Sequence, residues 1–95
     1  MLFAVHCLDR PNSLDDRREN FDAHMAHIKA TPAKIVVSGP LLADDNETTI
    51  GSLFIVDAPS KADAEAFNKA DPFYKAGIWK ETRIHPFLKR IDNRT

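Results

Sequence analysis

The chain holds a single cysteine, Cys7, so no intrachain disulfide can form. No apolar run approaches the roughly 20 residues that a membrane-spanning helix needs. The segment 1–10 is apolar, but it is too short for the core of a signal peptide and lacks a basic lead-in. These absences predict a cytoplasmic protein in a reducing compartment, with no membrane partner.

Neither sign of charge is in excess, because thirteen Lys and Arg residues are matched by fourteen Asp and Glu residues. The basic residues are scattered, whereas a nucleic-acid interface needs a clustered positive excess, so no nucleic-acid partner is expected. With 43% hydrophobic and 28% charged residues, the composition is that of a folded domain. The 95 residues predict one domain, 1–95, with no room for a separate cofactor-binding module, and we expect no cofactor.

The pattern of apolar residues predicts four strands, 2–8, 34–38, 50–57 and 78–88, and two helices between them. Ser13 with Asp16, and Ser60 with Asp63, resemble the capping boxes that open helices. The acidic segment 43–49 fits an exposed hairpin loop between the second and third strands. The order β-α-β-β-α-β is that of the ferredoxin-like α+β fold, in which both helices cover one face of an antiparallel sheet.

The sheet of such a fold has one face without helices. The strands 2–8 and 50–57 are nonetheless apolar on both faces, which indicates burial on both sides. A chain this short buries only a modest core and gains from self-association. We therefore expect a homodimer that forms through the helix-free sheet face, in a dimeric α/β-barrel-like assembly.

The stretch 70–77 interrupts what would otherwise be one ordinary helix. Proline disfavours helical geometry at the residue before it, so Asp71 is expected at a bend. Pro72 suits the first position of a new short helix, with Asp71 as its N-cap and Gly77 just past its end. A carboxylate in this position either caps a helix or forms half of a site.

The first predicted helix, which ends near residue 30, has one apolar stripe, formed by Leu14, Phe21, Met25 and Ile28. Arg17 and His24 fall together on one border of this stripe, and His27 lies toward solvent. In the ferredoxin-like order this helix packs beside the segment that follows the second helix, so His24 can meet Asp71. A carboxylate fixes the tautomer of an imidazole, as a general base requires. The alternative is a boundary histidine and an aspartate that only caps.

Five further positions are candidates for binding a small-molecule substrate. At the end of the second strand, Gly39 lets a substrate approach the backbone and Ser38 can donate a hydrogen bond, although a simple strand end is equally consistent. Phe73 and Trp79 can line an aromatic pocket, or pack in the core as such residues commonly do. Arg17 can hold an anionic group, or remain a solvated helical arginine.

Metal and thiol chemistry have little support in the sequence. His24 and His27 are three residues apart, but no third ligand stands at a recognisable spacing, so no metal is expected. The loop 43–49 lacks the glycine and the terminal glutamate of a calcium loop. Cys7, in the middle of an apolar strand, fits inert packing.

One combination of short motifs is specific when its members are taken in order: Arg17, His24, Ser38-Gly39-Pro40, Asp71-Pro72-Phe73 and Ala76-Gly77-Ile78. It resembles the YCII-related family of small bacterial proteins, from the first strand to Pro86-Phe87. Many members have a glycine where Thr31-Pro32-Ala33 stands here. The resemblance implies a ferredoxin-like dimer with a histidine–aspartate pair proposed as catalytic, which falls on His24 and Asp71, with Ser38 near it.

The sequence leaves two functions open. The first is a cofactor-independent enzyme in which His24, oriented by Asp71, acts as general base or acid, while Ser38 and the amide of Gly39 stabilise negative charge on a substrate oxygen. The resemblance implies lyase, dehalogenase or isomerase steps on small ring compounds, so the expected substrate is partly aromatic or hydroxylated. The second is a non-catalytic dimer that binds a small ligand or a partner.

Overall fold

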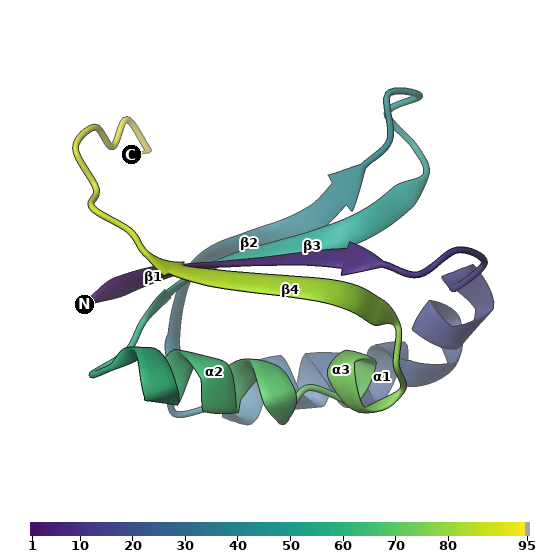
Figure 1. Cartoon of the computed structure of the whole chain (residues 1–95), viewed down its shortest axis with the longest axis horizontal. Coiled ribbons are helices and arrows are strands. Elements are labelled where there is room, and N and C mark those ends of the chain that lie inside the picture. Colours follow the sequence, from purple (N-terminus) through teal and green to yellow (C-terminus); the bar gives the residue numbers. More distant parts are fainter. Residues whose placement is uncertain (95) are drawn as a thin grey trace.

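The computed structural model describes residues 1–94 and contains one four-stranded antiparallel sheet (Figure 1). Its strands are β1 (Leu2–Asp9), β2 (Lys34–Leu42), β3 (Thr49–Asp57) and β4 (Trp79–Pro86). They lie in the order β2-β3-β1-β4, and each neighbouring pair is antiparallel. The predicted α+β fold with ferredoxin-like strand order is confirmed.

All four strands differ from their predicted bounds, the first and the third by only one residue. The second continues through Pro40 to Leu42 instead of ending at residue 38. Because β2 is an edge strand, the missing N–H of proline costs no ladder hydrogen bond there. The fourth strand is one residue shorter at its start and ends at Pro86.

The helices α1 (Leu14–Ala30), α2 (Lys61–Lys69) and α3 (Pro72–Lys75) all lie on one side of the sheet (Figure 1). The core fills the space between these two layers. On β1 and β3 every second side chain points into it, in accord with the two-residue period of a strand: Phe3, Val5 and Cys7, and Ser52, Phe54 and Val56. The side chains that alternate with them, Leu2, Ala4, His6 and Leu8 on β1 and Leu53 and Ile55 on β3, face the helix-free side.

One of the two predicted capping boxes is wrong. At the start of α2, Ser60 Oγ accepts a hydrogen bond from the backbone N–H of Asp63 at 3.3 Å, as expected. At the start of α1, Ser13 makes no such bond. Its hydroxyl instead lies 3.4 Å from Asp9, and Asp16 pairs with Arg10. Both side chains therefore bind residues outside the helix. The spacing of Ser13 and Asp16 in the sequence gives no sign of these partners.

The apolar stripe of α1 faces a cavity rather than the core. Leu14 and Phe21 of that stripe remain 43% and 53% exposed. On the opposite flank, His27 does not face solvent as predicted. Its Nε2 lies 3.0 Å from the carbonyl oxygen of Phe67, to which it donates, because α2 packs beside α1 there.

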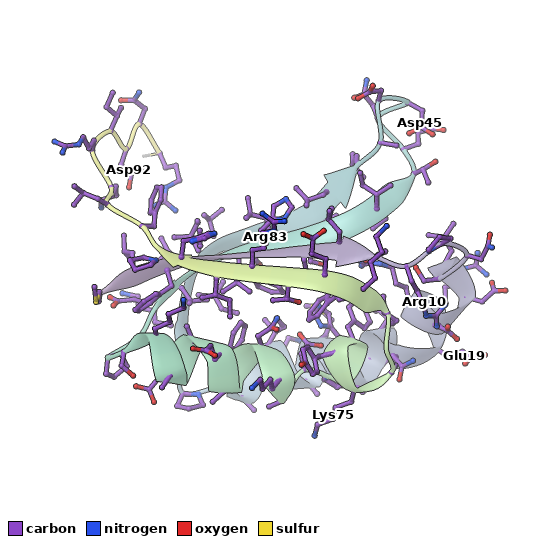
Figure 2. All side chains as sticks on the ribbon, in the orientation of Figure 1. Arg10, Glu19, Asp45, Lys75, Arg83 and Asp92 are labelled. Carbon is purple, nitrogen blue, oxygen red and sulfur yellow. The ribbon has the colours of Figure 1, made fainter. Side chains whose placement is uncertain are left out.

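The loop between β2 and β3 and the tail after β4 both rise on the helix-free side of the sheet, at opposite ends of it; Figure 2 labels Asp45 and Asp92 on them. The tail touches the sheet through Arg94, which donates to the carbonyl of Val36 at 3.3 Å. Thr95 lies outside the described residues. Within residues 1–94, none of the helices has the length and apolar character needed to cross a membrane.

Candidate functional site

A cavity of about 670 Å³ separates α1 from β2 and β3. One wall is the apolar stripe of α1 with Arg17 and His24, and the other comes from Ser38, Gly39, Pro40, Thr49, Ser52 and Phe54. Phe73 of α3 also lines the cavity. Four of the predicted substrate-binding residues, Arg17, Ser38, Gly39 and Phe73, therefore meet in one space with the histidine.

Asp71 lies beside this cavity, and both of its predicted features are present. Its extended backbone precedes Pro72, and its side chain caps α3 by accepting the N–H of Phe73 at 2.8 Å. Gly77 follows the helix with a φ of +71°, a conformation that glycine adopts without strain. Asp71 itself is fully buried. The bend thus fixes a carboxylate in the interior, where its remaining capacity to accept hydrogen bonds needs a partner.

That partner is His24, whose Nδ1 lies 2.8 and 2.9 Å from the two carboxylate oxygens of Asp71. The side chains of His24 and Asp71 are only 11% and 1% exposed. Because a carboxylate only accepts hydrogen bonds, Nδ1 carries the hydrogen and the lone pair of the neutral ring lies on Nε2. Nε2 has no hydrogen-bond partner within residues 1–94 and is not enclosed, so it is open to the cavity.

Phe73 holds the imidazole plane in place. The rings of His24 and Phe73 stack with centroids 3.9 Å apart and planes only 3° from parallel. The guanidinium carbon of Arg17 lies 5.0 Å from the centroid of the same Phe73 ring, within cation–π range. One aromatic side chain therefore orients both the imidazole of His24 and the nearest cation.

Arg17 is held by groups that the sequence did not single out. Its Nε and Nη2 bind both oxygens of Asp9 at 2.6 and 2.9 Å, and Nη2 also donates to the Gly51 carbonyl and to Ser52 Oγ, each at 3.0 Å. Asp9 ends β1 on its core face, where the pairing with β4 shifts register. Ser52 is the polar member of the buried side of β3. The signal for Ser52 is a hydroxyl at an inward position of an apolar strand, whereas Asp9 stands directly before Arg10, Pro11 and Asn12, a sequence typical of a turn.

Trp79 takes no part in the cavity wall, although we expected it there. It packs behind the site, with its ring centroid 5.9 Å from that of Phe73 and 6.2 Å from that of Phe54. Its position at the start of β4 directs the side chain into the core. Gly39 borders the cavity with open space around it, since an added Cβ would meet no atom within 4 Å. A ligand can therefore approach the backbone there.

Cys7 is a further buried titratable group, and it does not line this cavity. Cys7 receives hydrogen bonds from Asn68 and Thr82, both neutral groups, and burial raises the pKa of its thiol to about 11. The thiol is thus protonated at neutral pH. Within residues 1–94, no three His, Cys, Asp or Glu side chains converge as metal ligands would.

Similar proteins and a similar structure are known. The YCII-related domain matches residues 1–88. Protein YciI of Escherichia coli O6:H1 and that of Shigella flexneri are each 28% identical to this chain over 96 residues, which covers 94% of it and 98% of theirs. A Haemophilus influenzae protein is 27% identical over the same shares.

Among solved structures, the chain is similar to 5-chloro-2-hydroxyhydroquinone dehydrochlorinase (TftG) of Burkholderia phenoliruptrix AC1100, in complex with 2,5-dihydroxybenzoquinone. The TM-score is 0.82 and the sequence identity 36%, over 93% of this chain and 94% of that one. That protein is an enzyme whose named substrate is a hydroxylated ring. The match over residues 1–88 shows that the chain belongs to the YCII-related domain family.

Proposed function

We propose that the protein is a cofactor-independent enzyme that moves protons on a small hydroxylated ring, of the lyase or dehalogenase type. One observation carries the proposal: His24 Nδ1 is held at 2.8 Å by the buried Asp71, which leaves Nε2 as the basic atom at the cavity. This is the arrangement of a general base whose tautomer and orientation are fixed by a carboxylate. The likeness to TftG supports a ring compound as substrate.

Loss of hydrogen chloride from a chlorinated trihydroxy ring illustrates the proposed chemistry. Nε2 takes the proton of a ring hydroxyl and returns it to the conjugated ring carbon that carries chlorine, which becomes tetrahedral. The neutral Nε2 then takes the proton of a second hydroxyl, whose electron pair passes through the ring and expels chloride, and the imidazolium finally releases this proton to solvent. Asp71 stabilises the imidazolium each time it forms, and Ser38 and the backbone of Gly39 bind a ring oxygen as it gains charge.

The direct test is turnover of 5-chloro-2-hydroxyhydroquinone, followed as chloride release and as quinone absorbance. We expect both signals from the wild-type chain and neither above background from His24→Gln. Other hydroxylated rings with a leaving group extend the assay if this one is not accepted. Tight binding of 2,5-dihydroxybenzoquinone with no turnover of any ring would instead support the non-catalytic ligand-binding dimer.

We also propose that a second copy of the chain covers the helix-free sheet face. Apolar side chains gather there at neighbouring positions, since Ile55 lies opposite Ala4 on β1 and Val37 on β2, with Leu53 two residues along. Val37 is 46% exposed in the single chain. A solution mass that stays at 10.7 kDa as the concentration rises would contradict the dimer.

Two further proposals concern the cellular location of the protein and its macromolecular partners. The free and buried Cys7 supports a cytoplasmic location, where thiols stay reduced. The balanced charges support a protein without a nucleic-acid partner. Failure to bind DNA or RNA in low salt, where such contacts are strongest, is the expected result.

A further inference from the structure

We infer that Ser52 is a substrate-binding donor and that Asp9 is the residue that positions it, acting through Arg17. Ser52 Oγ accepts a hydrogen bond from Arg17 Nη2 at 3.0 Å. The described residues provide no acceptor for the hydroxyl hydrogen of Ser52, which lines the cavity although the residue is only 4% exposed. A buried donor without a partner costs stability, and a ligand oxygen in the cavity removes that cost.

The direction of this hydroxyl is fixed by the arginine. Arg17 donates to the Ser52 oxygen, so the hydrogen of Ser52 must point elsewhere, and the cavity is the open side. Donation from a cation also polarises the hydroxyl, which strengthens the hydrogen bond that Ser52 can give to an anion. The pair therefore favours a ring oxygen that carries negative charge.

Asp9 determines where the arginine stands. It holds Nε and Nη2 of Arg17 by a bidentate contact, and the Asp9 and Arg17 side chains are 5% and 14% exposed. The Gly51 carbonyl also accepts from Nη2, but only the carboxylate of Asp9 binds two nitrogens of the guanidinium and so fixes the angle at which it reaches Ser52.

Ser52 and Ser38 together define the class of substrate. In the β2–β3 ladder Ser38 lies opposite Phe54 and Pro40 lies opposite Ser52, so the two serines are diagonal neighbours on the cavity side. Diagonal positions on two neighbouring strands are roughly 7–8 Å apart, so one ring with oxygens on different sides can reach both serines. The inference rests on the proposed function, and it narrows the substrate to ionised rings with at least two oxygens.

The test uses 2,5-dihydroxybenzoquinone as a coloured probe and measures its dissociation constant by absorbance, without turnover. Loss of a hydrogen bond to an anion predicts about 10- to 100-fold weaker binding for Ser52→Ala. Ser13→Ala is the matched control, because Ser13 is a buried serine that also touches Asp9 but does not line the cavity. It should change the constant by less than about twofold.

The role of Asp9 is tested by a double-mutant cycle. Asp9→Asn alone should weaken probe binding about 10-fold, but in the Ser52→Ala background by less than about twofold, because Asp9 acts through Ser52. A purely structural role would give equal losses in both backgrounds. If Asp9→Asn fails to fold, Arg17→Lys takes its place in the cycle, because lysine keeps the charge but cannot bridge Asp9 and Ser52. It should weaken probe binding in the wild-type background and have little effect in the Ser52→Ala background.

The outcomes separate the two proposals. Probe binding by wild type that is unchanged in Ser52→Ala would overturn this inference and leave the enzyme proposal intact. Binding that depends on Ser52, without turnover of any ring, would support the inference and contradict catalysis. A wild-type chain that does not bind the probe at all would overturn both the ionised-ring substrate class and the role of Ser52.

Discussion

Two histidines three residues apart on α1 differ in their ring partners and in their surroundings, and the proposed function assigns proton transfer to only one of them. Each has one ring nitrogen held: Nδ1 of His24 by the carboxylate of Asp71, and Nε2 of His27 by the neutral carbonyl of Phe67. His24 opens onto a cavity with hydroxyls and an arginine, whereas His27 borders a groove lined mainly by alanines and prolines. A hydrogen bond to one ring nitrogen therefore does not by itself make a histidine suited to act as a general base. The charge of the partner and the surroundings of the other nitrogen distinguish His24 from His27.

The largest expected difference in kcat is between two single variants, in which either His24 or His27 is replaced by glutamine. His24→Gln removes the proposed base and should lower kcat for chloride release by about a hundred- to ten-thousandfold. His27→Gln can still donate to the Phe67 carbonyl and should stay within about threefold of wild type. Steady-state kinetics measure both. Equal losses in the two variants would remove the distinction between the histidines.

Replacing Asp71 with asparagine separates its charge from its capping role. Asparagine is as good an N-cap as aspartate, so α3 should remain. Its amide can present either a donor or an acceptor to Nδ1, so the tautomer is no longer fixed, and kcat should fall on the order of a hundredfold. Nitrogen-15 NMR of the imidazole reports the tautomer directly. An unchanged spectrum in Asp71→Asn would show that the two side chains are not coupled.

Cys7 adds a buried group that has only neutral hydrogen-bond partners. Its pKa is raised from 9.0 to about 11, chiefly by burial, so the thiolate fraction at pH 8 should be about a hundredfold below that of a free thiol. Reaction with a coloured disulfide reagent should be correspondingly slow and become fast in denaturant. Because the folded pKa is the higher one, Cys7 favours the folded state below pH 9 and loses this contribution between pH 9 and 11.

Asp45 adds the opposite case, a carboxylate in full solvent. Hydrogen bonds from Thr48, through its hydroxyl and backbone, lower the pKa of Asp45 to about 2. Thr48→Val should raise that pKa toward its ordinary value, which carbon-detected NMR titration measures. Since the folded pKa is the lower one, the stabilisation is present near neutral pH and is lost as the pH falls toward 2. We expect a small change in acid unfolding and none at pH 7.

The order of elements, and half of the site, could be predicted from local rules. Strands and helices follow from apolar periodicity, and Asp71 follows from the way proline restricts the residue before it. The position of His24 on the border of the α1 stripe then placed it near that carboxylate. These inferences need only the geometry of one element, or the packing of two neighbouring ones.

The rest of the site depends on contacts between distant segments, which local rules do not see. Arg17 meets Asp9 from β1 and Ser52 from β3, and the register of β1 against β3 must be known before these three residues can be placed together. Trp79 was expected at the cavity because it follows the bend, but strand alternation directs it into the core. The prediction of a capping box at Ser13 is wrong for the same reason, because the Ser13 hydroxyl donates a hydrogen bond to Asp9 of β1 instead.

Asp71 both binds His24 and caps α3, and this combination limits which substitutions the chain can accept at this position. In many enzymes the catalytic carboxylate is an unsatisfied burden, so replacing it raises stability while activity is lost. Here the oxygens that hold His24 also close the first turn of α3, and the residue is wholly buried. Most substitutions at this position therefore harm folding and activity together. Selection for stability alone would keep the aspartate, and the site can persist in descendants that no longer use it.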